Sequence, residues 1–350
     1  MLLPSAILQG CAGPITPIYK APPSLLALEQ EKQLSLAFSQ RLEHQQRVSR
    51  ISYPLLQAGA LFCGEQTKAS LGISFSNKQG IEEKYRDTAI RDLGLGDALQ
   101  ILRVTPESPA AAAGLKPGDV LVSINGEFFK TGKQASKSVT ALLRPLKAGT
   151  PINLVVARQG QSLSLQVTPV EICDFPILIS HQDEVNAWAN GNQISLTTGL
   201  LRFCGDDHDL ALVIAHELAH NALRHVPKIT RNALSGSLID LLALGFGVPS
   251  PALFTIAGAH IHRSQFEAEA DYFGLYILAL SHLPLEGSAN FWRRVAAEYP
   301  EQIDDSLGST HPSSPQRFLA LKAAITEIKT KQHNQFPLTP EGFVHPASKP

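Results

Sequence analysis

Residues 209–220 read Asp-Leu-Ala-Leu-Val-Ile-Ala-His-Glu-Leu-Ala-His, and this stretch decides how the C-terminal half of the chain folds. Apolar residues surround its polar ones, which is typical of a buried helix. His216 and His220 are four residues apart, so both imidazoles leave one helix face and can bind the same ion. Glu217 lies beside them, where a carboxylate can take a proton from a metal-bound water. The stretch therefore predicts a buried metal-binding helix.

Chance is a poor explanation of this spacing. In a chain of 350 residues with 12 histidines, His-Glu-x-x-His is expected roughly 0.02 times. The alternative is that His216 and His220 are ordinary core histidines and that Glu217 is a surface carboxylate. A candidate third ligand elsewhere in the chain favours the metal-site interpretation over this alternative.

A second acidic segment can supply that ligand. A catalytic zinc site needs a third protein ligand and leaves its fourth position for water or substrate. In Phe266-Glu267-Ala268-Glu269-Ala270-Asp271, Glu267 and Asp271 share one helix face, so one can ligate while the other orients a ligating histidine. Glu269 points to another face and is expected in solvent. The alternative is a charged, solvated face, but the flanking aromatic residues indicate burial, and a buried carboxylate requires a partner.

His-Glu-x-x-His followed about 50 residues later by Glu-x-x-x-Asp resembles the HtpX and CaaX-prenyl-protease type of zinc metallopeptidase. The resemblance implies one Zn²⁺ per chain, with His216, His220 and Glu267 as its ligands. It also implies that Glu217 is the general base and that Asp271 supports a ligating histidine. It covers about residues 174–330.

Two further segments agree with this family. Asn186 and Ala187, ahead of a strand predicted at 194–200, resemble the strand that lines the family's cleft, which implies that they pair with the substrate backbone. His311, in Thr-His-Pro, and Arg317 resemble the family's late His-Pro and Arg pair. His311 would then be an oxyanion stabiliser or a switchable extra ligand, and Arg317 would brace the site. A surface histidine in a loop is the alternative for His311.

The region 71–168 has a different pattern, with short β-like runs separated by turns. Its central string, Ala113-Gly-Leu-Lys-Pro-Gly-Asp-Val-Leu121, predicts a short helix ended by glycine, a turn and a strand. The string resembles the core of a PDZ domain. The resemblance implies that Leu71, Gly72 and Ile73 form the carboxylate-binding loop, which captures a peptide C-terminus. The alternative is a PDZ domain that only positions or regulates its neighbour.

None of the four cysteines belongs to a Cys-x-x-Cys pair, which argues against a structural zinc knuckle. Cys11 follows Leu8-Gln9-Gly10, which resembles the lipobox of bacterial lipoproteins and implies a lipid anchor. The alternative is a plain apolar tail, because only ten residues precede Cys11 and none is basic. In an oxidising compartment, Cys63 and Cys173 are expected to form a disulfide around the first folded module; two buried thiols are the alternative.

Composition and charge narrow the class of protein. The chain has 44% hydrophobic residues, which suits globular domains, and a formal net charge of −1, which argues against nucleic acid as a partner. Its longest apolar stretch, 234–259, is interrupted by Asp240, Pro249 and Pro251, so it does not predict a membrane span. It predicts a mobile lid over the cleft or two short buried helices. Membrane contact is expected only through the lipid anchor.

We therefore predict an α+β chain in five parts. They are a signal or lipobox remnant with a proline-rich tether (1–23), helices that pack on the peptidase (24–66), an inserted β-rich PDZ domain (67–172), a mainly helical zincin-type zinc metallopeptidase domain with a small edge sheet (173–333) and a disordered tail (334–350).

The predicted activity is zinc-dependent hydrolysis of peptide bonds in unfolded or misassembled proteins of a bacterial envelope. The enzyme would face the periplasm, anchored at the outer membrane, and its PDZ domain would recognise C-termini or regulate the protease. The alternative is a periplasmic chaperone or assembly factor with a latent or inactive protease site. The complete set of ligand candidates argues against that alternative.

Overall fold

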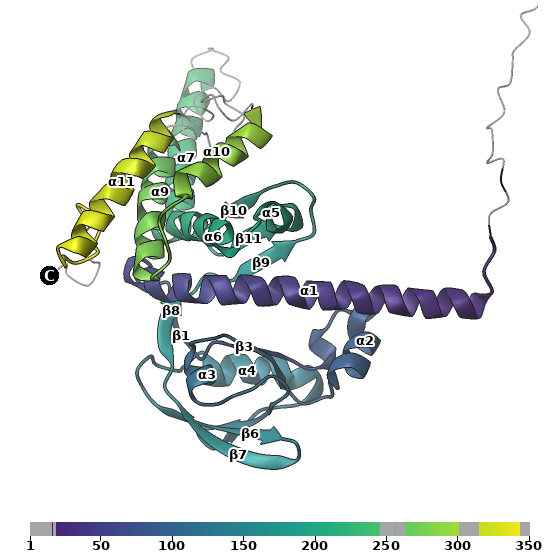
Figure 1. Cartoon of the computed structure of the whole chain (residues 1–350). Helices are drawn as coiled ribbons and strands as arrows, with labels where there is room; N and C mark the ends of the chain where they lie inside the picture. The colour runs from purple at the N-terminus through teal and green to yellow at the C-terminus, as the bar shows by residue number, and fades with distance from the viewer. Residues whose placement is uncertain (1–15, 17–18, 246–255, 257–262, 301–314, 344–350) are drawn as a thin grey trace, which may run out of the picture.

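One long helix, α1 (Pro23–Gly59), runs past both halves of the molecule in the computed structural model, which describes residues 16, 19–245, 256, 263–300 and 315–343. A β-rich domain lies on one side of α1 and a mainly helical body on the other (Figure 1). The sequence predicted helices over 24–66, and the structure has one long helix there, which continues through Pro54. The short 3-10 turn η1 (Ala60–Phe62) follows.

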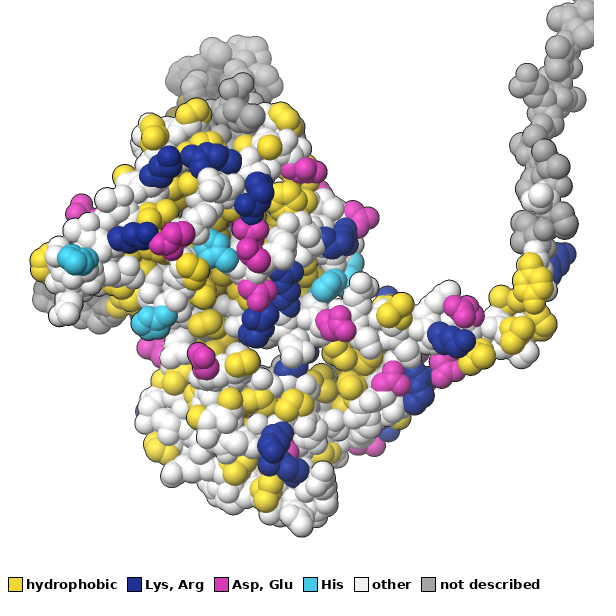
Figure 2. Space-filling view, viewed as in Figure 1, with side chains coloured by type: hydrophobic (Ala, Val, Ile, Leu, Met, Phe, Trp, Pro, Cys, Tyr) yellow, Lys and Arg dark blue, Asp and Glu magenta, His cyan; other side chains and the backbone are white. Residues whose placement is uncertain are grey.

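The two ends of α1 have different surroundings. Leu25, Leu26 and Leu28 near its start are exposed, and Figure 2 shows hydrophobic side chains at this free end. Towards its other end, Ile51 and Leu55 are buried in the core of the helical body. The C-terminal part of α1 is therefore a structural element of that body, although the β-rich domain separates the two in sequence.

The β-rich domain is an antiparallel sheet whose strands run in the order β2-β3-β4-β6-β7, with β5 paired to β4. Its apolar face packs on its own helices and forms a separate core. The sheet comprises β2 (Ile73–Ser76), β3 (Gln100–Val104), β4 (Val120–Ile124), β5 (Glu127–Phe128), β6 (Ile152–Arg158) and β7 (Gln161–Val167). The helices are α2 (Glu83–Leu93), α3 (Pro109–Ala112) and α4 (Ala135–Leu143), with 3-10 turns η2 (Lys78–Gly80) and η3 (Gly132–Gln134).

The chain enters and leaves this domain through one two-stranded ladder. Strands β1 (Thr67–Ser70) and β8 (Val170–Cys173) pair antiparallel, with Thr67 opposite Cys173. A disulfide joins Cys63 to Cys173, with an S–S distance of 2.03 Å. The domain is therefore an insertion whose two connections are tied together at its base.

The helical body contains a small sheet in the order β10-β11-β9, in which β9 and β11 are parallel. Its strands are β9 (Ile177–Ser180), β10 (Ala187–Ala189) and β11 (Ile194–Thr197). Its helices are α5 (Thr198–Phe203), α6 (Asp207–Ala222), α7 (His225–Gly245), α9 (Arg263–Leu280), α10 (Ser288–Glu298) and α11 (Pro315–His333).

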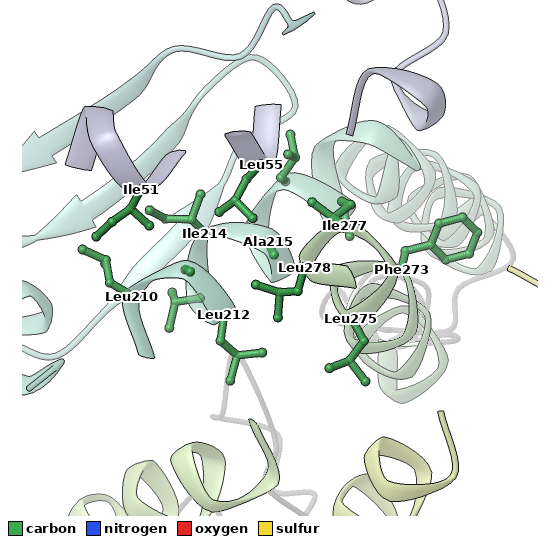
Figure 3. Close-up of a cluster of buried hydrophobic side chains, with 14 of the residues drawn as sticks. Ile51, Leu55, Leu210, Leu212, Ile214, Ala215, Phe273, Leu275, Ile277 and Leu278 are labelled. Carbon is green, nitrogen blue, oxygen red and sulfur yellow. The ribbon is translucent and has the colours of Figure 1, made fainter. Parts of the chain in front are cut away.

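Helices α6 and α9 form the centre of this body. Figure 3 shows Leu210 and Ile214 of α6 close to Ile51 and Leu55 of α1, with Leu278 of α9 beside them. At Gly274 of α9 an added Cβ would lie 3.2 Å from the backbone nitrogen of His216, so the two helices approach closely there. This contact fixes the separation of the two segments in which the sequence placed ligands.

The C-terminal segment differs from the prediction of a disordered tail over 334–350. Phe343 packs edge-on against Phe62 and Phe273, with ring centroids 5.1 Å and 5.8 Å apart. The backbone nitrogen of Glu341 donates to the hydroxyl of Tyr272 at 3.0 Å. Residues up to 343 are thus attached to the helical body by packing and hydrogen bonds.

Some predicted features lie outside the described residues. Cys11 and His311 are among them, as is most of the predicted tether. Of the predicted lid at 234–259, the structure describes the end of α7, which stops at Gly245, and residue 256. Among the described helices, none combines the length and the hydrophobicity that crossing a membrane requires.

Candidate metal centre

Helix α6 presents the metal-binding motif from inside the core. The side chain of Asp206 accepts a hydrogen bond from the backbone nitrogen of Asp209 at 2.9 Å and caps the start of the helix. His216, Glu217 and His220 are 1%, 2% and 7% exposed. Three polar side chains on one buried helix need partners, because polar groups without them are unfavourable in a core.

Glu267 of α9 lies opposite the two histidines. One of its carboxylate oxygens is 3.4 Å from Nε2 of His216, and the other is 3.4 Å from Nε2 of His220. The two Nε2 atoms are 3.1 Å apart. His216, His220 and Glu267 therefore direct one nitrogen or oxygen each towards a common point.

These separations suit a zinc ion. Ligands about 2.1 Å from a tetrahedral zinc lie about 3.4 Å from one another, close to the three measured distances. Two imidazoles and one carboxylate are also a donor set found in catalytic zinc sites. The residues present therefore fit the metal that the sequence predicted.

Asp271 supports His216 from the side away from Glu267. Its Oδ1 is 2.9 Å from Nδ1 of His216, and Arg317 of α11 donates to both its oxygens, at 2.6 Å and 2.9 Å. The guanidinium of Arg317 also lies 3.9 Å from the ring centroid of Trp292, which packs edge-on against His216. Helices α9, α10 and α11 thus orient one ligand of α6.

The charges of this group are interdependent. Burial acts to lower the pKa of His216, but its bonds to Asp271 and Glu267 outweigh burial and raise that pKa to about 9. Burial acts to raise the pKa of Asp271, but Arg317 and His216 lower it to about 2. Asp271 is therefore a fixed anion at neutral pH, and it aligns the imidazole through Nδ1.

His220 has a different partner, which the sequence did not reveal. Its Nδ1 is 3.0 Å from Nδ1 of His225, the first residue of α7, and Nε2 of His225 is 2.9 Å from a carboxylate oxygen of Glu269. His225 is fully buried, and the ring of Phe266 lies 4.8 Å from it. Glu269, predicted to be solvated, is a half-buried partner of this histidine instead.

Strand β10 runs along one edge of the sheet beside α6. Ala187 pairs with Leu196 of β11, and the backbone nitrogen of Asn186 donates to Oγ1 of Thr197 at 3.1 Å. Asn221 of α6 connects the sheet to the metal helix, because its amide accepts from Gly191 N at 2.7 Å and donates to Gln193 O at 3.0 Å. The other edge of β10 pairs with no strand among the described residues.

Leu71 and Gly72 precede β2, an edge strand of its sheet, and Ile73 is its first residue. Gly72 has φ +75°, a conformation that other residues adopt with strain. The backbone oxygen of Leu71 accepts from Ala110 N at 2.9 Å, and that of Gly72 accepts from Thr105 N at 2.8 Å. These bonds hold the loop against the start of α3.

Comparison with known protein families gives two matches, to consecutive segments of the chain. Residues 69–168 match the sequence model of the PDZ domain, and residues 169–325 match that of peptidase family M48. These two matches agree with the mixed α+β fold that the sequence predicted.

Relatives resemble part of the chain. The mitochondrial metalloendopeptidase OMA1 of Arabidopsis thaliana is 34% identical over 168 residues, which are 44% of this chain and 32% of the relative. OMA1 of Saccharomyces cerevisiae is 29% identical over 146 residues, 36% of this chain and 39% of the relative. The beta-barrel assembly-enhancing protease of Yersinia pestis is 26% identical over 172 residues, 44% of this chain and 35% of the relative.

The chain spans between 32% and 39% of the length of these three relatives. All three are named as proteases, and two of the names specify a metalloendopeptidase. The matched segment contains the buried His-Glu-x-x-His helix, Glu267 and Asp271. Residues 69–168 thus resemble a PDZ domain, and residues 169–325, which hold the candidate metal centre, resemble the peptidases of family M48.

Proposed function

We propose that the protein is a zinc-dependent endopeptidase. The observation that carries the proposal is the convergence of His216, His220 and Glu267 on one point, with Glu217 on the same helix. Zinc bound there would act as a Lewis acid that acidifies water and polarises the scissile carbonyl. Glu217 would take the proton of the attacking water and deliver it to the leaving amine.

The rest of the domain would position the substrate. The edge of β10 that pairs with no described strand can accept an extended polypeptide as an additional strand beside Asn186 and Ala187; because the backbone of Asn186 is bonded to Thr197, Ala187 would supply the pairing groups. Main-chain pairing of this kind depends little on the side chains of the substrate. It therefore suits unfolded or misassembled proteins of varied sequence. His311 is proposed to stabilise the developing oxyanion or to act as an exchangeable ligand.

The setting that we propose is a bacterial envelope. A disulfide between Cys63 and Cys173 suits an oxidising compartment such as the periplasm. Lipidation at Cys11 would hold the protein at the outer membrane, and the PDZ loop at Leu71–Ile73 would recognise exposed C-termini or regulate the protease. We therefore propose that the protein acts in the quality control of envelope proteins.

Cleavage of an unfolded protein tests the activity. Purified protein is incubated with casein, and release of peptides is measured with and without a zinc chelator. Glu217→Gln keeps the size and polarity of the side chain but removes the base, so activity should fall at least about 100-fold. The variant should bind as much zinc as the unmodified protein, because the ligands are intact.

The same experiment separates the protease from its rival. A chaperone with a silent protease site would cleave nothing, and it would suppress aggregation of an unfolded protein equally well with and without the Glu217→Gln substitution. Equal casein cleavage by the variant and the unmodified protein, at equal zinc content, would contradict the role of Glu217.

A further inference from the structure

A cavity of about 320 Å³ lies where α1, strand β3 of the PDZ domain and strand β9 of the peptidase domain meet. It shares no lining residue with the metal centre. Figure 1 shows α1 between the two domains, and the lining residues come from α1 and from both domains, so the cavity belongs to the junction between them. A ligand bound here would contact three elements at once.

The cavity is cationic. Arg41, His44, Arg103 and His181 line it, and none of its described lining residues is acidic. Arg41 is already paired, because its guanidinium lies 2.6 Å from the carboxylate of Glu82. Among these described lining residues, the positive charge that remains uncompensated is that of Arg103.

Arg103 has no carboxylate partner among the described residues. Its Nη1 donates to Oε1 of Gln45 at 3.1 Å, while its buried Nε has no hydrogen-bond acceptor in the described part of the chain. Burial lowers the pKa of Arg103, and no described anion counteracts that effect. A partly buried guanidinium with a free N–H is unfavourable unless an acceptor satisfies it.

A second donor lies next to it. Ser74 is opposite Arg103 in the β2–β3 ladder, and its hydroxyl is also buried and without a hydrogen-bond partner in the described structure. Arg103 lines the cavity and its Nε–H lacks an acceptor among the described residues, so an oxyanion is the component that would satisfy it; the hydroxyl of Ser74, which is not a lining residue, also lacks a partner nearby.

The opposite wall is apolar. Val48 of α1 and Ile177 and Ile179 of β9 line it. Strand β9 is an edge strand, whose outer side pairs with no other strand among the described residues. The cavity therefore combines an oxyanion site, an apolar surface and a free strand edge, which suit one end of an extended polypeptide.

We propose that this cavity binds the C-terminal carboxylate of a polypeptide whose last side chain is apolar. Arg103 receives the carboxylate, His44 and His181 line the same cavity, and the last side chain lies against Ile177 and Ile179. Free phosphate would satisfy Arg103 but would leave the apolar wall uncovered. The site is separate from the loop at Leu71–Ile73 and does not depend on peptidase activity.

Calorimetric titration of the full-length chain tests the proposal. The chain carries Glu217→Gln so that the probe stays intact, and the probe is acetyl-Val-Leu with a free carboxylate. The matched amide should bind at least about tenfold more weakly, because it loses a charge-assisted bond to arginine. Inorganic phosphate at equal concentration should displace little of the peptide.

Variants of Arg103 locate the binding. Arg103→Met keeps the apolar stem and should weaken the peptide at least about tenfold, whereas Arg103→Lys keeps the charge and should lose less. Lys32→Met removes an exposed cation of α1 that does not line the cavity, so it should change affinity less than about threefold. Should Arg103→Met fail to fold by circular dichroism, His181→Gln on the exposed side of the cavity should still weaken binding.

Three outcomes overturn the proposal. The acid and the amide could bind equally, so that no carboxylate is recognised. Arg103→Met could bind as well as the parent, which places the peptide at another site such as the Leu71–Ile73 loop. Phosphate could bind while the peptide acid does not, which makes the cavity a site for free oxyanions only.

Discussion

At the scale of single residues, the two histidines of the metal centre have different supports. Asp271, itself held by Arg317, accepts from His216, so a fixed anion aligns that ring. His220 contacts a second imidazole, that of His225, whose far nitrogen reaches the half-exposed Glu269. When Nε2 of His220 binds a metal, its Nδ1 carries the proton and donates to His225, which in turn donates to Glu269.

Replacing His225 should therefore weaken metal binding without removing a ligand. His225→Ala is expected to lower zinc affinity by about 10- to 100-fold, because His220 loses the partner that fixes its tautomer and orientation. Competition with a chromophoric chelator measures this directly and does not rely on activity. His225→Asn, whose side-chain oxygen can accept near the position of Nδ1, is the matched control and should retain most of the affinity. Equal losses in both variants would show that the imidazole acts only by filling space.

The sequence predicted the side chains that converge on one point, but it predicted only some of the residues that contact them. His216 and His220 follow from helical spacing, and Glu267 and Asp271 from a second motif with the same spacing. His225 could not be found in this way, because α6 ends at Ala222 and the chain then turns at Arg224, whose φ is +59°, which returns His225 to the core. Spacing rules for a single helix do not extend across such a turn. Trp292 was missed for a similar reason, since only tertiary packing brings α10 to His216.

At the scale of elements, the geometry of the metal centre depends on how closely α6 and α9 pack. Gly274 allows this contact, since an added Cβ would lie 3.2–3.3 Å from backbone atoms of Ala215 and His216. Backbone atoms cannot rotate away as a side chain can. The separation of Glu267 and Asp271 from His216 is thus set by a residue that bears no functional group.

Gly274→Ala should consequently destabilise the protein, although alanine is the better helix former. A free helix would gain about 1 kcal/mol from this change, but overpacking against α6 is expected to cost about 1–3 kcal/mol. Urea denaturation measures the stability, and chelator competition should show weaker zinc binding. Gly205→Ala is the control, because nothing lies within 4 Å of the added carbon. It should leave both the stability and the zinc affinity nearly unchanged. A more stable Gly274→Ala with normal affinity would refute the close-packing argument.

Elements with strong local sequence signals could be predicted, whereas features that depend on tertiary packing could not. The strands and turns of the PDZ region carry strong local signals, such as Pro117-Gly118-Asp119 before β4. The continuity of α1 through Pro54 has no local signal, because proline ordinarily interrupts a helix. Burial of Leu55 and Leu56 in the peptidase core compensates for the missing hydrogen bond, and that burial exists only in the folded molecule.

At the scale of the whole molecule, one covalent bond closes the insertion. Cys63 follows α1, and Cys173 ends the strand by which the chain returns from the PDZ domain, 110 residues later. The bond therefore limits how far the two ends of the insertion can separate in the unfolded chain. It also connects the turn after α1 to the first segment of the peptidase core.

Removal of this disulfide should lower stability substantially. Cys63→Ser with Cys173→Ser is expected to reduce the free energy of unfolding by about 2–5 kcal/mol, the range for closing a loop of this size. Urea denaturation of the oxidised parent, the reduced parent and the double variant checks this. The reduced parent should resemble the variant, and reductant should not affect the variant further. A parent equally stable with and without reductant would show that the bond contributes nothing to the fold.

The insertion also sets an order of assembly. The PDZ sheet draws all its strands from one contiguous stretch, so it can form as soon as that stretch is available. The end of α1 can be buried only later, because its partners α6 and α9 come more than 140 residues further along the chain. Likewise, Asp271 can bind Arg317 only after α11 has been made. A chain made from its N-terminus thus completes its candidate metal centre last. If the protein is the protease proposed above, this order of assembly would leave its site incomplete, and so unable to cleave neighbouring chains, until most of the chain has been made.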